Sequence, residues 1–382
     1  MSLLTIDSTG VFEPKKGAFI INCTSTSTST SSTSKTQSKI DGSEKIAAFD
    51  LDWTLIRPRG KTKFPKDYDD WILMEGVKDT LIDLYNKNYK IVIFTNQSGS
   101  KFDPKLFQKK IKNISHELQV PLQVFGCTET GYCRKPSVGL WLILMRKNEN
   151  IPINLKKSFY VGDAAGREGD WADTDLKFAL NIGIKFMDTS FFQDPNQAEV
   201  FDIPEHPFDL ISNNSNTDPI IIPERQQMII LVGPPASSKT TIAQDIVSER
   251  ENWIIVSQDE LKTKARVIKE IEKSLEAGLS VIVDRKNEYI KDREELITLA
   301  GPIPVSIIWF DIPLKLSEHL CMYREIMTGK HIPQVVFNKY YSKDKGLEIP
   351  TMQEDVESIV RLEFFIDESK IENKVIFYSY LI

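Results

Sequence analysis

Two aspartates one residue apart are the residues of this sequence whose spacing points most directly to chemistry. Asp50 and Asp52 follow the apolar run 46–49 and precede Thr54. Residues i and i+2 of a strand project from one face, so both carboxylates would share a small volume if the extended backbone continues. Two like charges there are unfavourable unless a cation or a shared proton offsets them, and Mg²⁺ prefers such oxygen ligands. Taken alone, the spacing fits an Asp-rich turn after a strand equally well.

Two later apolar segments also end in polar residues. Residues 90–97 end in the hydroxyl of Thr95 and the two amides that follow it, of which the first is Asn96. Residues 158–167 contain the pair Gly-Asp, whose acid is Asp163. Lys135 lies between these segments, in the sequence Arg-Lys-Pro. Because ligands bind outside the carboxyl ends of the strands of an open parallel sheet, we expect these groups to meet in one site.

A second group of residues suited to phosphate binding begins after the apolar run 228–232. The strand enters a turn and then Lys-Thr opens a helix, which is the context of a phosphate-binding loop. In such a loop, Lys239 would reach the β- and γ-phosphate oxygens and Thr240 would hold Mg²⁺. The consensus has Gly before the lysine, so the Cβ of Ser238 must be accommodated. The nucleotide-binding residues expected here are Gly233, Ser237, Ser238, Lys239, Thr240 and Thr241.

Expected strands and helices alternate along the chain around both the aspartate motif and the phosphate-binding loop. This alternation predicts an α/β fold with two mostly parallel sheets. Amphipathic helices are expected at 79–86, 104–118 and 260–276. We predict a mostly disordered segment over 1–43 with a short strand at 18–21, since 24–39 is almost entirely Ser, Thr, Lys and Gln. The predicted domains cover 44–192 and 226–382, with a connecting segment at 193–225.

The overall composition limits the class of protein. The chain has 382 residues, of which 41% are apolar and 27% charged, and a net charge of −6. This charge argues against a generally basic nucleic-acid binder and requires any such contact to use a local basic surface. The four cysteines lack metal-ligand spacing and fit reduced thiols. No apolar run reaches the ~20 residues of a membrane span.

The motifs resemble those of a known superfamily. The segments FDLDWTLI, VIFTNQSG, RKP, VGDAAGR and FALNIGIKF are similar to those of haloacid-dehalogenase-like (HAD-like) phosphatases. They resemble most closely the phosphatase half of the bifunctional polynucleotide kinase 3′-phosphatases, and residues 225–345 resemble the kinase half. The resemblance implies two doubly wound α/β domains, a HAD-like phosphatase followed by a P-loop kinase.

The resemblance also implies roles for residues of the phosphatase half. Asp50 would be the nucleophile and Asp52 the general acid and base, while Thr95 and Lys135 would hold the transferring oxygens. Mg²⁺ would be held by Asp50, the backbone carbonyl of Asp52, and Asp163. We assign Asn96 and Arg57 to substrate binding, the latter because 57–63 is basic and follows the first motif. Asp175 is either a support for the metal or a surface acid. Trp53 stands where Gly is usual and needs no phosphate contact; Trp71, Trp141 and Trp171 are expected to pack rather than to stack on bases.

In the kinase half, the resemblance implies that Asp259 accepts the proton of a nucleic-acid 5′-hydroxyl while ATP donates the phosphoryl group. Arg324 would lie over the phosphates, and we assign Asp284 and Asn287 to substrate binding. Three features depart from the family pattern: Ser238, Met322 in place of a second lid arginine, and Arg285-Lys286 within the family's D-N-T-N segment.

The function expected from the resemblance is the processing of DNA ends for strand-break repair in the nucleus. A monomer would act on 3′-phosphate and 5′-hydroxyl ends with Mg²⁺ and ATP, alongside DNA-repair proteins and without a membrane. Three alternatives remain open: a 3′-phosphatase with a degenerate kinase domain, a non-catalytic protein that binds DNA ends, and a phosphatase of small sugar or histidinol phosphates. The last leaves the phosphate-binding loop unexplained.

Overall fold

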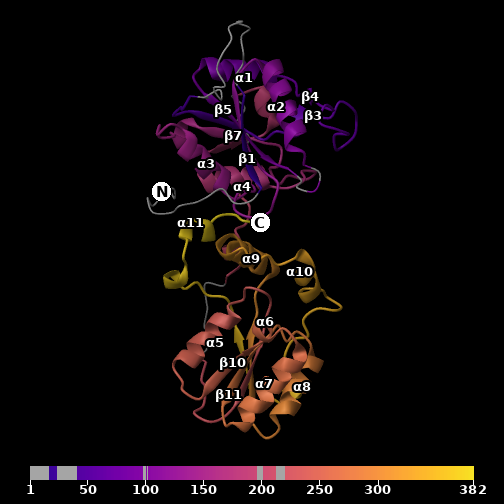
Figure 1. Ribbon diagram of the computed structural model, residues 1–382, viewed down its shortest axis with the longest axis vertical. Coiled ribbons are helices and arrows are strands. Elements are labelled where there is room, and N and C mark those ends of the chain that lie inside the picture. Colours follow the sequence, from indigo (N-terminus) through magenta and orange to yellow (C-terminus); the bar gives the residue numbers. More distant parts are fainter. Residues whose placement is uncertain (1–16, 24–40, 98–99, 101, 196–200, 212–219) are drawn as a thin grey trace. The chain divides into compact units, whose positions relative to one another are not determined.

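The computed structural model describes residues 17–23, 41–97, 100, 102–195, 201–211 and 220–382. The chain divides into two compact units (Figure 1), of which the first comprises Met1–Pro204 and Asn373–Ile382 and the second Glu205–Glu372. No helix in the described ranges has the length and apolarity to cross a membrane.

A six-stranded sheet forms the centre of the first unit, in the order β1-β6-β5-β2-β7-β8. Its strands are β1 Ala18–Cys23, β2 Ile46–Phe49, β5 Lys90–Asn96, β6 Leu122–Cys127, β7 Phe159–Val161 and β8 Lys185–Met187. All neighbours are parallel except the edge pair β1 and β6. The pair β3 Ile56–Arg57 and β4 Ile72–Leu73 forms a separate small antiparallel sheet.

Helices cover both faces of this sheet, as the predicted doubly wound fold requires. They are α1 Val77–Asn86, α2 Pro104–Leu118, α3 Gly139–Lys147 and α4 Thr174–Ile182, and the short helix α11 Lys374–Phe377 also belongs to this unit. On one face, Ile93 of β5 belongs to a buried cluster with residues of α1 and α2. On the other face, the ring of Phe94 lies 5.9 Å from that of Trp141 in α3 and 5.2 Å from that of Phe178 in α4. Successive residues of β5 thus pack on opposite layers, as strand geometry dictates.

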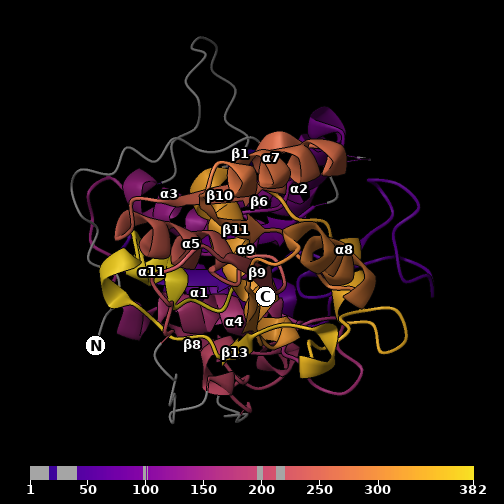
Figure 2. The same ribbon diagram turned by 90° about the horizontal axis from the view of Figure 1, so that it is seen from below.

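The second unit is built on a five-stranded, fully parallel sheet in the order β10-β11-β9-β12-β13. The strands are β9 Met228–Val232, β10 Trp253–Ser257, β11 Ser280–Asp284, β12 Val305–Phe310 and β13 Ser358–Leu362. The helices are α5 Lys239–Ser248, α6 Gln258–Leu261, α7 Lys264–Glu276, α8 Ile290–Ala300, α9 Leu314–Thr328 and α10 Gln334–Tyr340. Figure 2 shows this row of strands with α5 on one side and α8 on the other.

Most predicted elements have the expected bounds, and the differences have local causes. The helix at 104–118 is confirmed, with its N-terminus capped by Asp103. The single helix predicted at 260–276 is wrong: Lys262 adopts a φ of 68°, and the chain forms α6 and then α7, which Thr263 caps. A positive φ is incompatible with a continuous right-handed helix.

Several domain limits also differ from the prediction, and the predicted connecting segment 193–225 is divided between the two units at Pro204 and Glu205. The short strand predicted at 18–21 is confirmed as β1 Ala18–Cys23, which pairs with β6 along its whole length because the apolar residues around Ile21 complete the edge of the sheet. The first unit therefore includes residues before the predicted limit at 44. The last ten residues, predicted to end the second domain, belong to the first unit instead. The disorder predicted for 24–39 lies outside the described residues.

Candidate active sites

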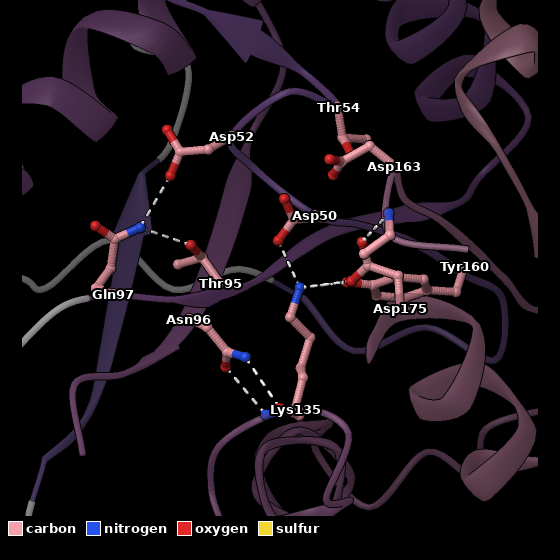
Figure 3. A network of polar contacts seen from close by, with 11 residues as sticks. Asp50, Asp52, Thr54, Thr95, Asn96, Gln97, Lys135, Tyr160, Asp163 and Asp175 are labelled. Atoms are coloured by element: carbon pink, nitrogen blue, oxygen red, sulfur yellow. Dashed lines mark hydrogen bonds and ion pairs between the residues drawn. The ribbon is translucent and has the colours of Figure 1, made fainter. Parts of the chain in front are cut away.

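The carboxyl ends of three neighbouring strands bring the predicted phosphatase residues together. Asp50 follows β2, Thr95 lies at the end of β5, and Asp163 follows β7. Since β2 lies between β5 and β7 in the sheet, the groups meet at its switch point, where open parallel sheets bind ligands. Figure 3 shows the side chains converging around Lys135.

Lys135 is the centre of this group. Its buried ammonium donates to Asp50 Oδ1 at 2.5 Å, to Asp175 Oδ1 at 2.8 Å and to the hydroxyl of Tyr160 at 2.8 Å (Figure 3). Burial opposes its charged form, but the charges of Asp175 and Asp50 outweigh burial and raise the pKa of Lys135. The residue is therefore a fixed cation beside the predicted nucleophile.

The backbone around Lys135 is held by two asparagine side chains. Asn96 Nδ2 donates to the Lys135 carbonyl, and Asn96 Oδ1 accepts from the Lys135 amide, both at 3.0 Å. Asn181, in the FALN segment, donates to the carbonyl of Pro136 at 2.9 Å. The substrate-binding role predicted for Asn96 is therefore replaced by a positioning role, because both ends of its amide bind the chain itself.

Asp175 and Tyr160 complete the site. The sequence left Asp175 open between a support for the metal and a surface acid, and it gave no role to Tyr160. The buried Asp175 accepts from Lys135, from Tyr160 and, through Oδ2, from the backbone amide of Ala164 at 3.1 Å. A Cβ on Gly162 would lie 2.4 Å from Asp175 Oδ2, so the glycine of the Gly-Asp motif makes room for this carboxylate. That glycine, followed by an acid at the start of the FALN helix, was the available signal. Asp175 is not a surface acid.

Asp52 lies at the other side of the site, away from the Lys135 cluster (Figure 3). Its carboxylate accepts from Gln97 Nε2 at 3.0 Å and from the ammonium of Lys110 at 3.3 Å. Gln97 also donates to Thr95 Oγ1 at 2.8 Å, which links the predicted acid to the predicted phosphate-binding hydroxyl. Gln97 belongs to the TNQ segment, whereas Lys110, in the middle of α2, had no sequence signal.

The residues present suit a divalent cation of the Mg²⁺ type. Oxygens of Asp50, Asp163 and Asp175 lie within 4.8 Å of one another, and Thr54 donates to Asp163 Oδ1 at 3.2 Å. Burial and the neighbouring acids raise the pKa of Asp50 well above its usual value, although Lys135 opposes this effect. Burial and the charge of Asp175 raise the pKa of Asp163 to about 6. Crowded carboxylates that resist ionisation favour a cation among them.

Arg57 is the predicted phosphatase residue that the structure does not connect to this group. It lies in β3, and its guanidinium donates to the carbonyl of Pro58 at 3.3 Å.

In the second unit, the predicted phosphate-binding loop connects β9 to α5. The ammonium of Lys239 donates to the carbonyls of Gly233 and Pro234, at 3.0 and 2.6 Å, and to Ser237 Oγ at 3.1 Å. Burial lowers the pKa of Lys239 to about 8. A Cβ on Gly233 would lie 2.8 Å from Phe310, so the loop requires glycine there. In this geometry the lysine occupies the loop that would surround the phosphates.

Ser238 has a left-handed backbone with a φ of 66°, and Ala236 has a φ of 56°. Glycine suits this conformation, whereas a residue with a Cβ is destabilised by roughly 1–2 kcal/mol. The loop therefore keeps its shape despite the missing glycine, at an energetic cost.

The hydroxyl of Thr240 donates to Asp284 Oδ2 at 2.6 Å, at the end of β11. This contact places the acid beside the predicted metal-binding hydroxyl. Thr241 is the next residue of α5 and is half-buried. Asn287, predicted to bind substrate, is instead buried and donates to the Leu231 carbonyl at 2.7 Å.

The remaining kinase residues are less constrained. Asp259 lies in α6, accepts from the ammonium of Lys330 at 2.6 Å, and has an exposed side chain. The hydrogen bond from Lys330 lowers its pKa. Arg324 lies in α9, where its buried Nε has no hydrogen-bond partner among the described residues.

Comparisons with known proteins identify the family of both domains. The sequence profile described as polynucleotide kinase 3 phosphatase matches residues 45–192, and a profile described as an AAA domain matches 228–339. A Schizosaccharomyces pombe protein named bifunctional polynucleotide phosphatase/kinase is 35% identical, over 85% of this chain and 81% of its own. An Acanthamoeba polyphaga mimivirus homologue is 30% identical over 88% of each chain. A Saccharomyces cerevisiae polynucleotide 3′-phosphatase is 31% identical over 40% of this chain and 90% of its own. The chain therefore belongs to the bifunctional polynucleotide phosphatase/kinase family.

Proposed function

We propose that this protein removes 3′-phosphates from DNA ends and phosphorylates 5′-hydroxyl ends with ATP. The observation that supports the phosphatase activity most strongly is the ion pair of 2.5 Å between Lys135 and Asp50, inside the domain that matches the phosphatase profile. A non-catalytic DNA-end binder would need neither this paired nucleophile nor the separate, solvent-accessible acid at Asp52.

In the proposed first reaction, Asp50 attacks the phosphorus of a 3′-phosphate, and the bond to the 3′-oxygen breaks. Asp52 donates a proton to the departing oxygen and then removes one from the water that hydrolyses the aspartyl-phosphate. Lys135 and Thr95 stabilise the charge on the transferring oxygens. Gln97 links Asp52 to Thr95, so the acid and the phosphate-binding hydroxyl keep a fixed separation.

Asp50 and Asp163, with Asp175 beside them, would hold Mg²⁺, together with the backbone carbonyl of Asp52. When bound, the cation neutralises phosphate charge and allows both carboxylates to remain ionised.

In the proposed second reaction, the γ-phosphoryl group of ATP passes to a 5′-hydroxyl. Asp259 accepts the proton of the hydroxyl, and Arg324 stabilises charge on the phosphates. Lys239 would exchange its contacts with the loop carbonyls for the β- and γ-phosphate oxygens. Thr240 and Asp284, already bonded to each other, would hold the Mg²⁺ of the nucleotide.

The two products, a 3′-hydroxyl and a 5′-phosphate, are the ends that a ligase joins. We therefore extend the proposal to a monomer that acts in strand-break repair in the nucleus and meets other DNA-repair proteins there. The preference for DNA over RNA is part of the proposal.

A second candidate function is that of a 3′-phosphatase whose kinase domain is inactive. The strained Ser238 in the phosphate-binding loop and the absence of a second lid arginine at Met322 favour it.

One substrate tests both functions: a nicked duplex with 3′-phosphate and 5′-hydroxyl ends, incubated with Mg²⁺ with or without γ-labelled ATP. The bifunctional enzyme would release inorganic phosphate in both mixtures and transfer label in the second, and Lys239→Ala would remove only the transfer. Release without transfer by the unaltered protein would favour the second candidate. Binding without release would reject both.

A further inference from the structure

The segment that follows β11 is bonded to the phosphate-binding loop of the second unit. The hydroxyl of Thr240 donates to Asp284 Oδ2 at 2.6 Å, and the backbone amide of Gly233 donates to the carbonyl of Lys286 at 3.2 Å. Arg285 lies between these two contacts in the chain. Its backbone is therefore held beside the loop that would surround the phosphates of ATP.

A buried ion pair fixes the same segment further along the chain. The guanidinium of Arg293 is 0% exposed and donates to both carboxylate oxygens of Glu354, at 2.6 and 2.8 Å, and to the carbonyl of Asn287 at 2.9 Å. The side chain of Asn287 donates in turn to the carbonyl of Leu231 in β9. Bidentate pairs between a guanidinium and a carboxylate fix the geometry of the groups that they join. The turn after β11 therefore has one defined position.

Arg285 differs from Arg293 in that its buried donors are not used. Its Nε and Nη1 atoms are buried, yet neither has a hydrogen-bond partner among the described residues. Buried donors in native proteins are almost always paired, so two on one guanidinium indicate an acceptor that arrives with a ligand. Because a guanidinium stays charged and presents a planar fork of donors, the matching acceptor is an anion such as a phosphate group.

The order of the strands indicates which anion passes this point. Strand β11 lies between β10, which leads to Asp259, and β9, which leads to the phosphate-binding loop (Figure 2). Neighbouring strands lie about 4.8 Å apart, so the end of β11 stands between the expected base and the expected phosphates. In the proposed kinase reaction, the γ-phosphoryl group of ATP crosses from the loop to the 5′-hydroxyl, past the end of β11.

Other cations of the kinase site are close to the same loop. Burial is the main cause that lowers the pKa of Lys239, and the charges of Arg324 and Lys286 lower it further. Lys286 is paired with Glu288 at 3.0 Å, whereas within the described part of the chain no acid forms an ion pair with Arg285. A phosphate among these cations would offset their mutual repulsion.

We infer that Arg285 binds the γ-phosphoryl group of ATP during its transfer. The bond between the γ-phosphorus and the oxygen that remains on ADP breaks, the bond to the 5′-oxygen forms, and the proton of the hydroxyl passes to Asp259. Arg285 donates to the γ-phosphate oxygens and so supplies, from the end of a strand, the charge that the lid lacks at Met322. This inference rests on the proposed kinase function and adds to it a residue that the family resemblance left without a role.

Nucleotide binding without turnover tests this assignment. The affinities for ADP and for the β,γ-imido analogue of ATP are measured by isothermal titration calorimetry, each with Mg²⁺ and without an oligonucleotide. One hydrogen bond between charged groups changes affinity roughly 10- to 100-fold. Arg285→Ala should weaken binding of the analogue by about that factor and leave the affinity for ADP nearly unchanged, because only the analogue carries a γ-phosphate. The retained affinity for ADP also shows that the loop is intact.

Arg266→Ala is the matched control, because Arg266 is an exposed arginine of the same unit that lies in α7. It should bind both nucleotides like the unaltered protein. Arg285→Lys keeps the charge but loses the planar fork of donors, so its affinity for the analogue should lie between those of the unaltered protein and Arg285→Ala. In the label-transfer assay, Arg285→Ala should lower the kinase kcat by roughly 10²-fold or more and leave phosphate release unchanged.

The binding data separate this inference from the proposed function. If the unaltered protein transferred no label, the kinase proposal would fail, and the two affinities would still decide about Arg285. Equal losses of affinity for both nucleotides with Arg285→Ala, or no loss for either, would overturn the inference. Failure of the unaltered protein to bind either nucleotide would overturn it as well, because Arg285 would then have no γ-phosphate to hold.

Discussion

The two candidate active sites use the same architecture but differ in how their key lysine is held. In the phosphatase site, the ammonium of Lys135 binds Asp50 and Asp175, which come from other segments of the chain. In the kinase site, the ammonium of Lys239 binds the carbonyls of Gly233 and Pro234 and the hydroxyl of Ser237, all in its own loop. The first lysine is fixed by partners that belong to the reaction, and the second by groups that the nucleotide would replace.

The acids differ in the same way. Asp52 is held by Gln97 and Lys110, whereas Asp259 is exposed on a short helix and bonded to one lysine. The phosphatase centre is thus assembled by folding, and we expect the kinase centre to be completed by ATP and the substrate strand. Preorganised groups contribute more to catalysis, because little reorganisation accompanies the reaction. The predictions below test this contrast.

The largest effect is expected from Asp50→Asn. The amide cannot attack phosphorus, so release of phosphate from a 3′-phosphorylated oligonucleotide should fall by roughly 10⁴-fold or more. Transfer of label from γ-labelled ATP to a 5′-hydroxyl oligonucleotide, measured on the same preparation, should remain at the rate of the unaltered protein. Release at the original rate would show that Asp50 is not the nucleophile.

The corresponding change in the kinase site is Lys239→Ala. Removal of one charge-stabilising donor should lower the kinase kcat/KM by roughly 10²- to 10³-fold. Phosphate release from 3′-phosphorylated strands should not change, because Lys239 has no part in that site. A parallel loss of both activities would instead indicate that the variant is misfolded, and circular dichroism distinguishes these outcomes.

The sequence predicted the phosphatase site well because its residues follow strands. The strand ends at Asp50, Thr95 and Asp163 are visible as apolar runs that stop at polar residues, and parallel pairing brings them together. Lys110 and Tyr160 could not be predicted, because a lysine within an amphipathic helix and a tyrosine within a buried strand have the same pattern as surface and core residues. Their roles depend on distances across the sheet that local periodicity does not contain.

The kinase site was predicted less accurately for the same reason. Asn287 follows a strand by three positions, but the backbone turns there with a φ of 47° and directs its amide into the sheet rather than towards a ligand. Backbone direction after a strand is set by tertiary contacts, which the sequence does not reveal.

The hydrogen bonds by which Asn96 and Asn181 hold the backbone at Lys135 and Pro136, here called the two clamps, should also affect the phosphatase. Asn96→Ala removes both bonds to the Lys135 backbone, and Asn181→Ala removes the bond to Pro136. Displacement of the ammonium by a fraction of an ångström should lower the phosphatase kcat by roughly 10- to 100-fold. Asn181 also donates to the carbonyl of Tyr380 at 2.8 Å and accepts from the amide of Tyr380 at 2.7 Å. Removal of residues 373–382 should therefore lower kcat as well.

For this prediction the kinase activity is the reference, since the clamps hold only the phosphatase loop. Asn86→Ala is a suitable control, because Asn86 is an exposed asparagine of the same unit that lies at the end of α1. An unchanged kcat for Asn96→Ala would show that the loop keeps its shape without the side chain.

The two sites should respond to pH in opposite directions. At limiting Mg²⁺, Asp163 with a pKa of about 6 becomes protonated as the pH falls below 6, so the apparent Mg²⁺ affinity of the phosphatase should fall by up to about tenfold per pH unit. Lys239 with a pKa of about 8 loses its charge as the pH rises above 8, so the KM for ATP should rise on the alkaline side. Titrations of Mg²⁺ and ATP between pH 5 and 9 measure both. Saturating Mg²⁺ should displace the proton from Asp163, so the fall of phosphatase activity on the acidic side of its pH profile should move to lower pH. If this fall stayed at the same pH, the assignment of Asp163 as a ligand would be contradicted.

The smallest effect is expected from the strained phosphate-binding loop. Because Ala236 and Ser238 have positive φ, Ala236→Gly and Ser238→Gly should each increase the free energy of unfolding of the second unit by less than about 1 kcal/mol, after the greater entropy of glycine is subtracted. Ala243→Gly is the matched control: Ala243 lies inside α5, where glycine should decrease the free energy of unfolding by about 1 kcal/mol. Urea unfolding followed by fluorescence measures all three. If the three variants were destabilised alike, the loop would not be strained, and Ser238 would no longer distinguish this kinase site from one with the usual glycine.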